Sequence, residues 1–340
     1  MTSGVSADRF LLIRLSAVGD VINTLPTLSL LRRARPDATI GFVVEDRAQD
    51  LLVDHPLVDR VHVFPRRRWG ELRRSPGSWG DFRSELSAYA KEIRGVGYQV
   101  AIDVQGNVKG GVHALLSGAP HRIGFARGYD RELNHWFSTD RVVPPSDRPH
   151  RVDKFASLLG PLGIEDAARE WVFPNTEEAD CTIRSYLHDN GIAPGEAVML
   201  HPGTSGRGAS KRWPPERFAE FARRVASELE QPVIVTWGPA EESLARDVAA
   251  GSDRVFAAPR TTSLLELLAL VRMARLFVSA DTGPMHLAAA SGIPCVALFG
   301  PKDPAVYAPY GEGHTVLYQP EGMDQISVDE VVAAAGRELG

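Results

Sequence analysis

An aspartate stands where a short loop ends and a helix is predicted to begin. Residues 10–15 read as a buried strand, and the loop SAVGD ends on Gly19 and Asp20. The glycine lets the backbone turn sharply, and open α/β sheets bind ligands at the carboxyl ends of their strands. Asp20 therefore lies where a bound ligand can meet its carboxylate. It fits equally well as a simple helix cap.

A loop rich in glycine and hydroxyl side chains follows a second buried strand at 197–201. It carries Thr204 and Ser205, and Lys211 stands shortly before a predicted helix. Free backbone N–H groups, hydroxyls and a lysine near a helix start favour a phosphate site. The loop is not a Walker A motif, because GxxxxGK[ST] is absent. A plain surface loop is the alternative.

A third strand, 276–280, leads into Asp281, Thr282 and Gly283, and His286 follows one turn into the next helix. Thr282 and the N–H groups near Gly283 can face a phosphate, and Asp281 can accept hydrogen bonds from sugar hydroxyls. His286 could contact either group. A histidine with a purely structural role fits the same pattern.

Two further stretches are candidates for binding a second substrate. Polar side chains follow strand 99–104 in a glycine-containing turn, and an ordinary strand-to-helix loop is the alternative there. The segment 66–74 is rich in arginine, with Trp69 and Trp79 beside it, and is long and polar enough for a mobile loop. Arginine suits phosphates and carboxylates, and tryptophan suits a lipid interface. The residues concerned are Gln105, Asn107 and Lys109, and Arg66, Arg67 and Arg68.

The elements that must position these residues alternate between strands and helices in both halves of the chain. This rhythm predicts parallel sheets covered by helices. A helix is expected near 20–34, starting or kinking at Pro26, and another at 153–162 after a loop at 141–153. The expected strands are 10–15, 39–44, 58–64 and 99–104, then 197–201, 232–237, 276–280 and 295–300.

Composition excludes several classes of protein. The 340 residues carry a net charge of −5, yet residues 1–150 hold 21 Lys and Arg against 17 Asp and Glu. The basic half suggests an anionic partner, while the acidic whole disfavours nucleic acid. Two cysteines outside any cluster argue against disulfides or structural zinc. We see no signal peptide or membrane-spanning run, and expect a cytoplasmic protein.

Taken together, the motifs resemble glycosyltransferase family 9, the lipopolysaccharide heptosyltransferases, and most closely their heptosyltransferase I branch. The matching stretches cover nearly the whole chain: LIRLSAVGDVINTLP, DVQGNVKGG, HRIGF, LHPGTSGRGASKRWP and VSADTGPMHLAAASGIPCVALFGPKDP. The piece GRGA before Lys211 and the segment 126–139 depart from the family pattern. The resemblance implies the GT-B fold, with two facing Rossmann-like domains and parallel sheets.

The resemblance also implies a function. It points to metal-independent, inverting transfer of heptose from ADP-heptose to a Kdo sugar of the lipid A core, with no cofactor besides this nucleotide sugar. Asp20 would be the base. The donor would be held by Thr204, Ser205, Lys211, Asp281, Thr282, Gly283 and His286, with Glu241 or Glu242 at the ribose. The acceptor would meet Gly19, Asp20, Gln105, Asn107, Lys109, Arg122 and Arg66 to Arg68.

We expect an acceptor-binding domain at 1–174, a donor-binding domain at 175–325, and a helix at 326–340 that packs back on the first domain. A monomer that visits the cytoplasmic face of the inner membrane would meet an anionic glycolipid acceptor there. The alternatives are a transferase for another nucleotide sugar or acceptor, a nucleotide-sugar epimerase, and a non-catalytic nucleotide-sugar binding protein. The basic N-terminal half argues against the epimerase, and the presence of both Asp20 and Lys211 against the binding protein.

Overall fold

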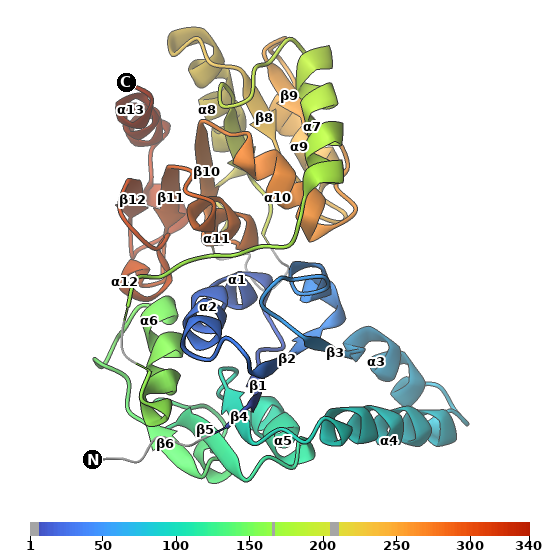
Figure 1. Ribbon diagram of the computed structural model, residues 1–340. Coiled ribbons are helices and arrows are strands. Elements are labelled where there is room, and N and C mark those ends of the chain that lie inside the picture. Colours follow the sequence, from blue (N-terminus) through green and yellow to red (C-terminus); the bar gives the residue numbers. More distant parts are fainter. Residues whose placement is uncertain (1–6, 165–166, 205–210) are drawn as a thin grey trace. The chain divides into compact units, whose positions relative to one another are not determined.

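The computed structural model describes residues 7–164, 167–204 and 211–340. It divides into two compact units, Met1–Asn175 and Thr176–Gly340, one residue beyond the expected boundary. In both units a parallel sheet is covered by helices, which confirms the predicted α/β class (Figure 1). No helix among the described residues is long and apolar enough to cross a membrane.

The first unit is built on a six-stranded parallel sheet with the order β3-β2-β1-β4-β5-β6. Strand β1 pairs with β2 on one side and with β4 on the other. The strands are β1 (Arg9–Ile13), β2 (Thr39–Glu45), β3 (Arg60–Phe64), β4 (Val100–Asp103), β5 (His121–Phe125) and β6 (Asp140–Val142). The helices are α1 (Val18–Ile22), α2 (Leu25–Ala34), α3 (Arg66–Arg74), α4 (Trp79–Gly95), α5 (Val108–Leu116) and α6 (Arg151–Ala156), with 3₁₀ turns η1 (Asp46–Leu51), η2 (Asn134–Trp136) and η3 (Ser157–Leu162).

The second unit repeats this architecture with the order β12-β11-β10-β7-β8-β9, again all parallel. Its strands are β7 (Val198–His201), β8 (Val233–Val235), β9 (Val255–Ala257), β10 (Leu276–Ala280), β11 (Cys295–Phe299) and β12 (His314–Tyr318). Its helices are α7 (Glu177–Asp189), α8 (Pro215–Glu228), α9 (Glu242–Ala249), α10 (Leu264–Arg272), α11 (Gly283–Ala290), α12 (Pro304–Tyr307) and α13 (Val328–Leu339), with a 3₁₀ turn η5 (Met323–Gln325).

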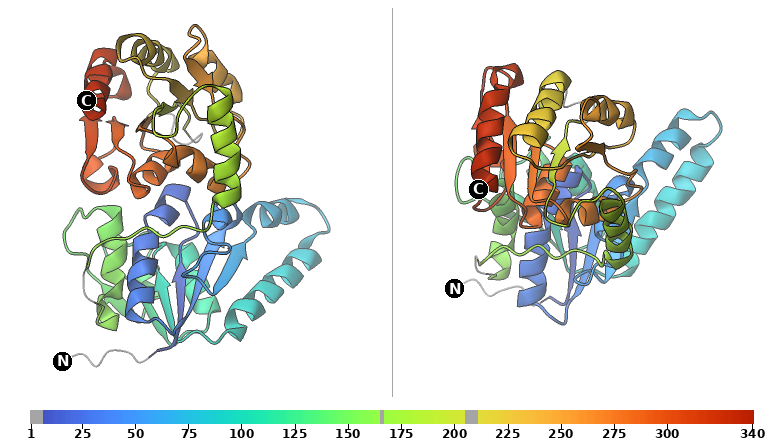
Figure 2. Two further views of the ribbon diagram at one scale, coloured as in Figure 1. Left: turned by 45° about the horizontal axis from the view of Figure 1, so that its top comes forward. Right: turned by 90° about the horizontal axis from the view of Figure 1, so that it is seen from above.

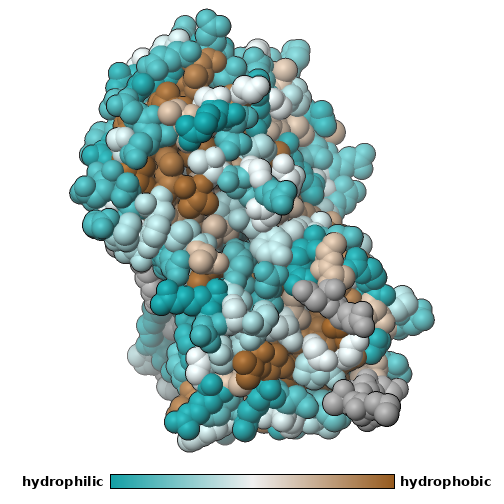
Figure 3. Space-filling view, turned by 90° about the vertical axis from the view of Figure 1, so that its left-hand side faces the viewer, coloured by the Kyte–Doolittle hydropathy of each residue, from teal (hydrophilic) through white to brown (hydrophobic). Residues whose placement is uncertain are grey.

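Burial explains why the strands read as continuous apolar runs. Residues 10–13 of β1 and all of β10 are buried, as expected for parallel strands that helices cover on both faces. Helix α8 instead buries one stripe, which includes Phe218, Phe221 and Val225. The face of the molecule in Figure 3 is mainly hydrophilic, with hydrophobic residues gathered in a few separate areas.

Of three expectations about local structure in the first unit, one was wrong and two were met in part. The basic segment 66–74 is the helix α3 and not a loop, because Trp69 and Leu72 pack into the hydrophobic core. The single helix expected near 20–34 is two helices, and Pro26 lies in the first turn of the second, where proline is tolerated. The expected loop 141–153 contains the end of β6 and the start of α6.

The C-terminal helix packs on the sheet and helices of the second unit. Helix α13 contacts α8 and strands β10 to β12 (Figures 1 and 2). Its residues Val328, Val331 and Ala335 belong to the same hydrophobic cluster as strands β7 and β10. The reason lies in its apolar stripe, which completes the helical layer on that sheet.

Trp213 links the loop before α8 to the segment before α13. Its ring is fully buried, lies edge-on to Phe218 with centroids 4.9 Å apart, and its Nε1 donates to the carbonyl oxygen of Ile326 at 2.9 Å. We expect Trp213→Ala to destabilise the second unit by about 3–5 kcal/mol, the usual loss for a buried aromatic. Hydrogen exchange should then accelerate in α8 and α13 while β1 to β6 stay protected.

The matched control is Trp79→Ala, because Trp79 is 56% exposed and its loss should change stability by less than about 0.5 kcal/mol. Unchanged exchange in α13 of the Trp213 variant would contradict this account of the linkage.

Candidate functional site

In the first unit the order of the strands reverses between β1 and β4. These two strands are neighbours although β2 and β3 separate them in the sequence, so the chain continues from β1 and from β4 toward opposite edges of the sheet. Ligands of open α/β sheets bind at such a point, beyond the carboxyl ends of the strands. The loop after β1 leads to Asp20 and the loop after β4 carries Gln105, so the structure brings both predicted residues to this place.

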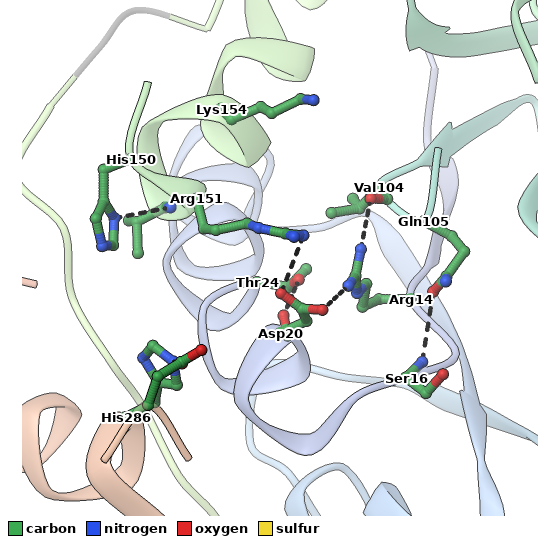
Figure 4. A network of polar contacts seen from close by, with 12 residues as sticks. Arg14, Ser16, Asp20, Thr24, Val104, Gln105, His150, Arg151, Lys154 and His286 are labelled. Carbon is green, nitrogen blue, oxygen red and sulfur yellow. Dashed lines mark hydrogen bonds and ion pairs between the residues drawn. The ribbon is translucent and has the colours of Figure 1, made fainter. Parts of the chain in front are cut away.

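Asp20 lies in the first turn of α1 with an arginine at each carboxylate oxygen. Arg14 pairs with Oδ2, and the Arg151 guanidinium lies 3.2 Å from Oδ1 (Figure 4). The Thr24 hydroxyl donates to the Asp20 carbonyl at 2.7 Å. The side chain of Asp20 is 22% exposed. A helix cap does not require two arginine partners, so the arrangement favours a chemical role over simple capping.

Arg14 is the buried member of this group, with 1% of its side chain exposed. Burial lowers its pKa to about 10, against the opposing effect of Asp20. Its Nη1 donates to the carbonyl oxygen of Val104 at 3.0 Å, and its guanidinium lies 5.0 Å from the Phe155 ring centre. The arginine thus joins the loops after β1 and β4 to helix α6.

Lys154 adds a further positive charge one turn along α6. Its Nζ donates to the carbonyl oxygen of Tyr129 at 2.7 Å and lies 4.5 Å from the Phe125 ring centre. Burial, and then the charges of Arg151, Arg131 and Arg14, lower its pKa to about 8. Together these residues form a cationic cluster around Asp20, which consists of Arg14, Arg131, Arg151 and Lys154.

Sequence reasoning missed this cationic cluster. The only local signal was a basic residue directly after a buried strand, at Arg14, and a basic helix start at 151–154. Nothing in the sequence pattern joins segments so far apart, and the pairing follows from the packing of α6 against α2.

The other polar residues after β4 hold the loops. Gln105 Oε1 accepts hydrogen bonds from the backbone N–H of Leu15 at 3.0 Å and of Ser16 at 3.4 Å, which fixes the loop before Asp20 (Figure 4). Asn107 caps α5 by accepting from the N–H of Gly110, whereas Lys109 is exposed on that helix.

Arg122 and Asp103 hold the segment that follows β5. Arg122 donates to the carbonyl oxygens of Phe137 at 2.7 Å and Ala119 at 3.0 Å. The buried Asp103 accepts from Asn134 at 2.7 Å, and burial raises its pKa to about 6. Both residues therefore fix the turn η2 against the sheet.

The first three arginines of α3 are paired with carboxylates of their own unit. Arg66 lies 3.1 Å from the fully buried Glu45. Trp69 is 6% exposed and donates to Glu85, so of the two tryptophans at this segment Trp79 is the exposed one, at 56%. The other two pairs are Arg67 with Glu71 and Arg68 with Glu85.

In the second unit the equivalent reversal of strand order lies between β7 and β10. Lys211, from the loop after β7, places its Nζ 2.5 Å from Asp281 Oδ2, after β10. His286 Nε2 lies 3.5 Å from Oδ1 of the same aspartate. Burial raises the pKa of Asp281, but the hydrogen bonds and charges of His286 and Lys211 outweigh it and hold this pKa well below its usual range.

Helix α11 begins beside this group. Thr282 is its N-cap residue and Gly283 its first residue, and no side-chain bond to Thr282 closes the cap. Backbone N–H groups at such a helix start suit an anion. Thr204 is nearly buried, and Arg212, which sequence reasoning passed over, donates to its hydroxyl at 3.3 Å and its carbonyl at 3.2 Å. Ser205 and the GRGA piece lie outside the described residues.

The structure distinguishes the two candidate glutamates. Glu241 accepts from the N–H of Gly238 at 3.0 Å and occupies the space where a Cβ at position 203 would lie. Glu242 instead pairs with Arg246 on the outside of α9. Beside Glu241, the buried His201 has its pKa lowered to about 4 by burial. Glu241 is therefore the one that adjoins the loop after β7.

The described residues contain no group of three or more His, Cys, Asp or Glu that could hold a metal ion. The candidate site of the first unit is a carboxylate within a cationic cluster. The candidate site of the second unit is an ion pair beside the start of a helix.

Comparison with known proteins agrees with these features. Residues 86–331 match the family model "Glycosyltransferase family 9 (heptosyltransferase)". Lipopolysaccharide heptosyltransferase 1 of Pseudomonas aeruginosa is 31% identical, over 91% of this chain and 83% of that protein. The Salmonella typhimurium protein of the same name is 28% identical, over 92% and 95% of the two chains.

Two solved structures have the same fold. A family 9 glycosyl transferase from Veillonella parvula has a TM-score of 0.82 at 25% identity, covering 100% of this chain and 98% of that one. E. coli heptosyltransferase WaaC with ADP-2-deoxy-2-fluoro heptose has a TM-score of 0.78 at 25% identity, covering 97% and 99%. With the matched family model, these likenesses establish that the chain belongs to glycosyltransferase family 9 and is a glycosyltransferase of the GT-B fold.

Proposed function

We propose that this enzyme transfers heptose from ADP-heptose to a Kdo sugar of the lipopolysaccharide inner core, with inversion and without a metal. The observation that carries the proposal is Asp20, held between Arg14 and Arg151 at the carboxyl end of β1. The names of the similar proteins, which include lipopolysaccharide heptosyltransferases and WaaC with an ADP-heptose analogue, support the choice of substrates.

In this proposal Asp20 takes the proton of the attacking acceptor hydroxyl. Each carboxylate oxygen can accept about two hydrogen bonds, so an oxygen that binds an arginine can still receive a proton from the substrate. The guanidinium groups of Arg14 and Arg151 fix the orientation of the Asp20 carboxylate, because each pairs with a different oxygen. Inversion follows when the hydroxyl attacks the anomeric carbon opposite the leaving diphosphate.

The second unit would hold the donor. Lys211, Thr204, Ser205 and the helix start at Thr282 and Gly283 would stabilise the charge that develops on the departing diphosphate. Lys211 would exchange its present partner, Asp281, for phosphate oxygens. Asp281 and His286 would then lie near the donor sugar. Glu241 would face the ribose, because Glu242 points away on α9.

The cationic cluster would bind the acceptor. Its guanidinium and ammonium groups match the carboxylates and phosphates of a Kdo-lipid. Gly19 would allow close approach, and Gln105, Asn107 and Arg122 would act by fixing loops. Contacts with the outer part of the acceptor would come from Lys109, Arg66, Arg67 and Arg68. The enzyme would work as a monomer at the cytoplasmic face of the inner membrane, where this glycolipid is exposed.

The role of Asp20 is tested by Asp20→Asn. We expect turnover to fall roughly 10²–10⁴-fold, the usual contribution of a general base, with ADP affinity nearly unchanged. Steady-state kinetics and calorimetric ADP titration measure the two effects. Asp37→Asn, at an exposed site, is the matched control. Near-normal turnover of Asp20→Asn would leave the carboxylate with a structural role only.

The role of Lys211 is tested by comparing ligands. Lys211→Ala should weaken binding of ADP roughly tenfold or more and leave adenosine binding nearly unchanged, since only the diphosphate meets the lysine. Lys302→Ala, at a lysine that packs on Tyr307, is the control. An equal loss for ADP and adenosine would remove Lys211 from the phosphate site.

The lowered pKa of Lys154 predicts that the KM for the acceptor depends on pH. Its lowered pKa of about 8 means that the ammonium is present below that pH and lost above it, while the carboxylates of an acceptor stay ionised throughout. The KM for the acceptor should therefore rise as pH increases from about 7 to about 9, roughly tenfold for the loss of one charged hydrogen bond.

Lys154→Arg should flatten this profile, because arginine keeps its charge, whereas Lys91→Arg on the exposed face of α4 should leave it unchanged. An identical rise in native enzyme and Lys154→Arg would assign the titration to another group.

A further inference from the structure

Helix α5 carries an apolar stripe that the first unit does not cover. Val108, Val112 and Leu115 are spaced four and three residues apart, so they share one side of the helix, and all three are exposed. The opposite side is buried and includes Gly110, His113 and Ala114. Figure 1 shows α5 beside α4 in the first unit. The stripe thus belongs to the surface and not to the core.

The segment at the turn η2, which is bonded to α5, displays two further apolar side chains. Leu133 is 53% exposed and Trp136 is 71% exposed. The two elements are fastened together, because Asn134 donates to the carbonyl oxygen of Asn107 at 2.7 Å and Glu132 accepts from the N–H of Val108 at 3.3 Å. We call the combined set the exposed apolar surface: Val108, Val112, Leu115, Leu133 and Trp136.

The backbone holds Leu133 in place at a conformational cost. Glu132 and Leu133 have φ angles of 58° and 57°, in the left-handed region. This region is unfavourable for side chains other than glycine, and it persists where the surrounding contacts impose it. Here the imposed conformation displays a leucine to solvent next to the most exposed tryptophan of the described chain. Such an arrangement is typical of a binding surface and not of ordinary polar exterior.

Exposed cationic side chains flank this surface. Lys109 lies on α5 beside the stripe, and Arg127, Arg131 and Arg141 are exposed on the flanking segments. The acids of the same segments have partners within the unit: Glu132 accepts from the N-terminus of α5, Asp130 pairs with His135, Asp140 accepts from the Thr139 hydroxyl, and Asp147 accepts from the Tyr129 hydroxyl. Exposed tryptophan and aliphatic side chains with lysine and arginine at the rim match an anionic lipid surface.

The same loop reaches the cationic cluster. Tyr129 accepts the hydrogen bond of Lys154, and Arg131, whose backbone N–H donates to Gly106, lies close enough to lower the pKa of both Lys154 and Arg14. A few residues later the chain displays Leu133 and Trp136. One segment, 126–137, therefore joins the proposed acceptor site to the exposed apolar surface.

We propose that the exposed apolar surface docks on an anionic lipid bilayer and so brings the cationic cluster to an acceptor whose lipid part stays in that bilayer. The proposal rests on the proposed function, because docking on a bilayer brings the enzyme to its acceptor only when that acceptor is a lipid in the bilayer. Trp136 and Leu133 enter the interfacial layer, the α5 stripe lies along it, and the flanking cations meet the headgroups.

The first test is vesicle binding. Trp136→Ser with Leu133→Asn, where asparagine tolerates the left-handed backbone, is compared with the matched control Trp79→Ser with Val53→Asn. Trp79 and Val53 are similarly exposed, at 56% and 42%, but lie outside the surface. Native enzyme and control should sediment with vesicles of phosphatidylethanolamine and phosphatidylglycerol. The surface variant should bind them roughly tenfold more weakly, and phosphatidylcholine vesicles should bind little of any of the proteins.

The second test separates docking from chemistry. With acceptor embedded in the anionic vesicles, kcat/KM of the surface variant should fall roughly tenfold. With a water-soluble fragment of the acceptor it should equal that of the native enzyme. Vesicle binding equal to native, or an equal loss in the control, overturns the proposal. So does a dimer, seen by light scattering of the native enzyme, that the surface variant abolishes. Failure of the native enzyme to use the soluble fragment would instead count against the proposed function, because vesicle binding is measured without any transfer.

Discussion

The first unit depends on one buried positive charge. A guanidinium group removed from water is costly unless it is paired and hydrogen-bonded. Arg14 meets this requirement with Asp20, with the carbonyl oxygen of Val104 and with the face of Phe155. Each partner comes from a different element, namely α1, the loop after β4 and α6. The need to compensate this single charge therefore brings together the segments that form the site.

The two units have the same strand order, but the charged side chains at the end of each sheet are balanced differently. In the first, several cations surround one carboxylate, which leaves an excess of positive charge for an anionic ligand. In the second, Lys211 and His286 both bind Asp281, so the charges largely cancel. The common architecture supplies the position, at the point where the strand order reverses. The side chains at that position decide which ligand is suited to it.

Local patterns predicted most of the framework. The strands around Asp20, Lys211 and Asp281 and the loops that follow them were visible because each is a short apolar run ending in glycine and polar residues. Helix α3 was misjudged, since its many arginines obscured the packing of Trp69 and Leu72. Strands β9 and β12 and helix α10 were not foreseen.

The partners of Asp20 were beyond the reach of a sequence pattern. Arg151 lies far along the chain, and its pairing with Asp20 arises only when α6 packs on α2. The same holds for Glu241 at Gly203, a contact between two loops that periodicity does not reveal. Residues that act through distant contacts follow from the fold, whereas residues that act through their immediate neighbours can be read from the sequence.

The ion pair between Lys211 and Asp281 has a consequence for selectivity. Lys211 is paired with the Asp281 carboxylate, so an anion that binds Lys211 would have to compete with Asp281 for it. An anion that carries little charge, or that contacts only Lys211, would gain little binding free energy by replacing Asp281. A diphosphate can offset the lost pair with more charge and with contacts to the start of α11 at the same time. If Lys211 holds the donor diphosphate as proposed, Asp281 would thus favour a diphosphate over small, singly charged anions.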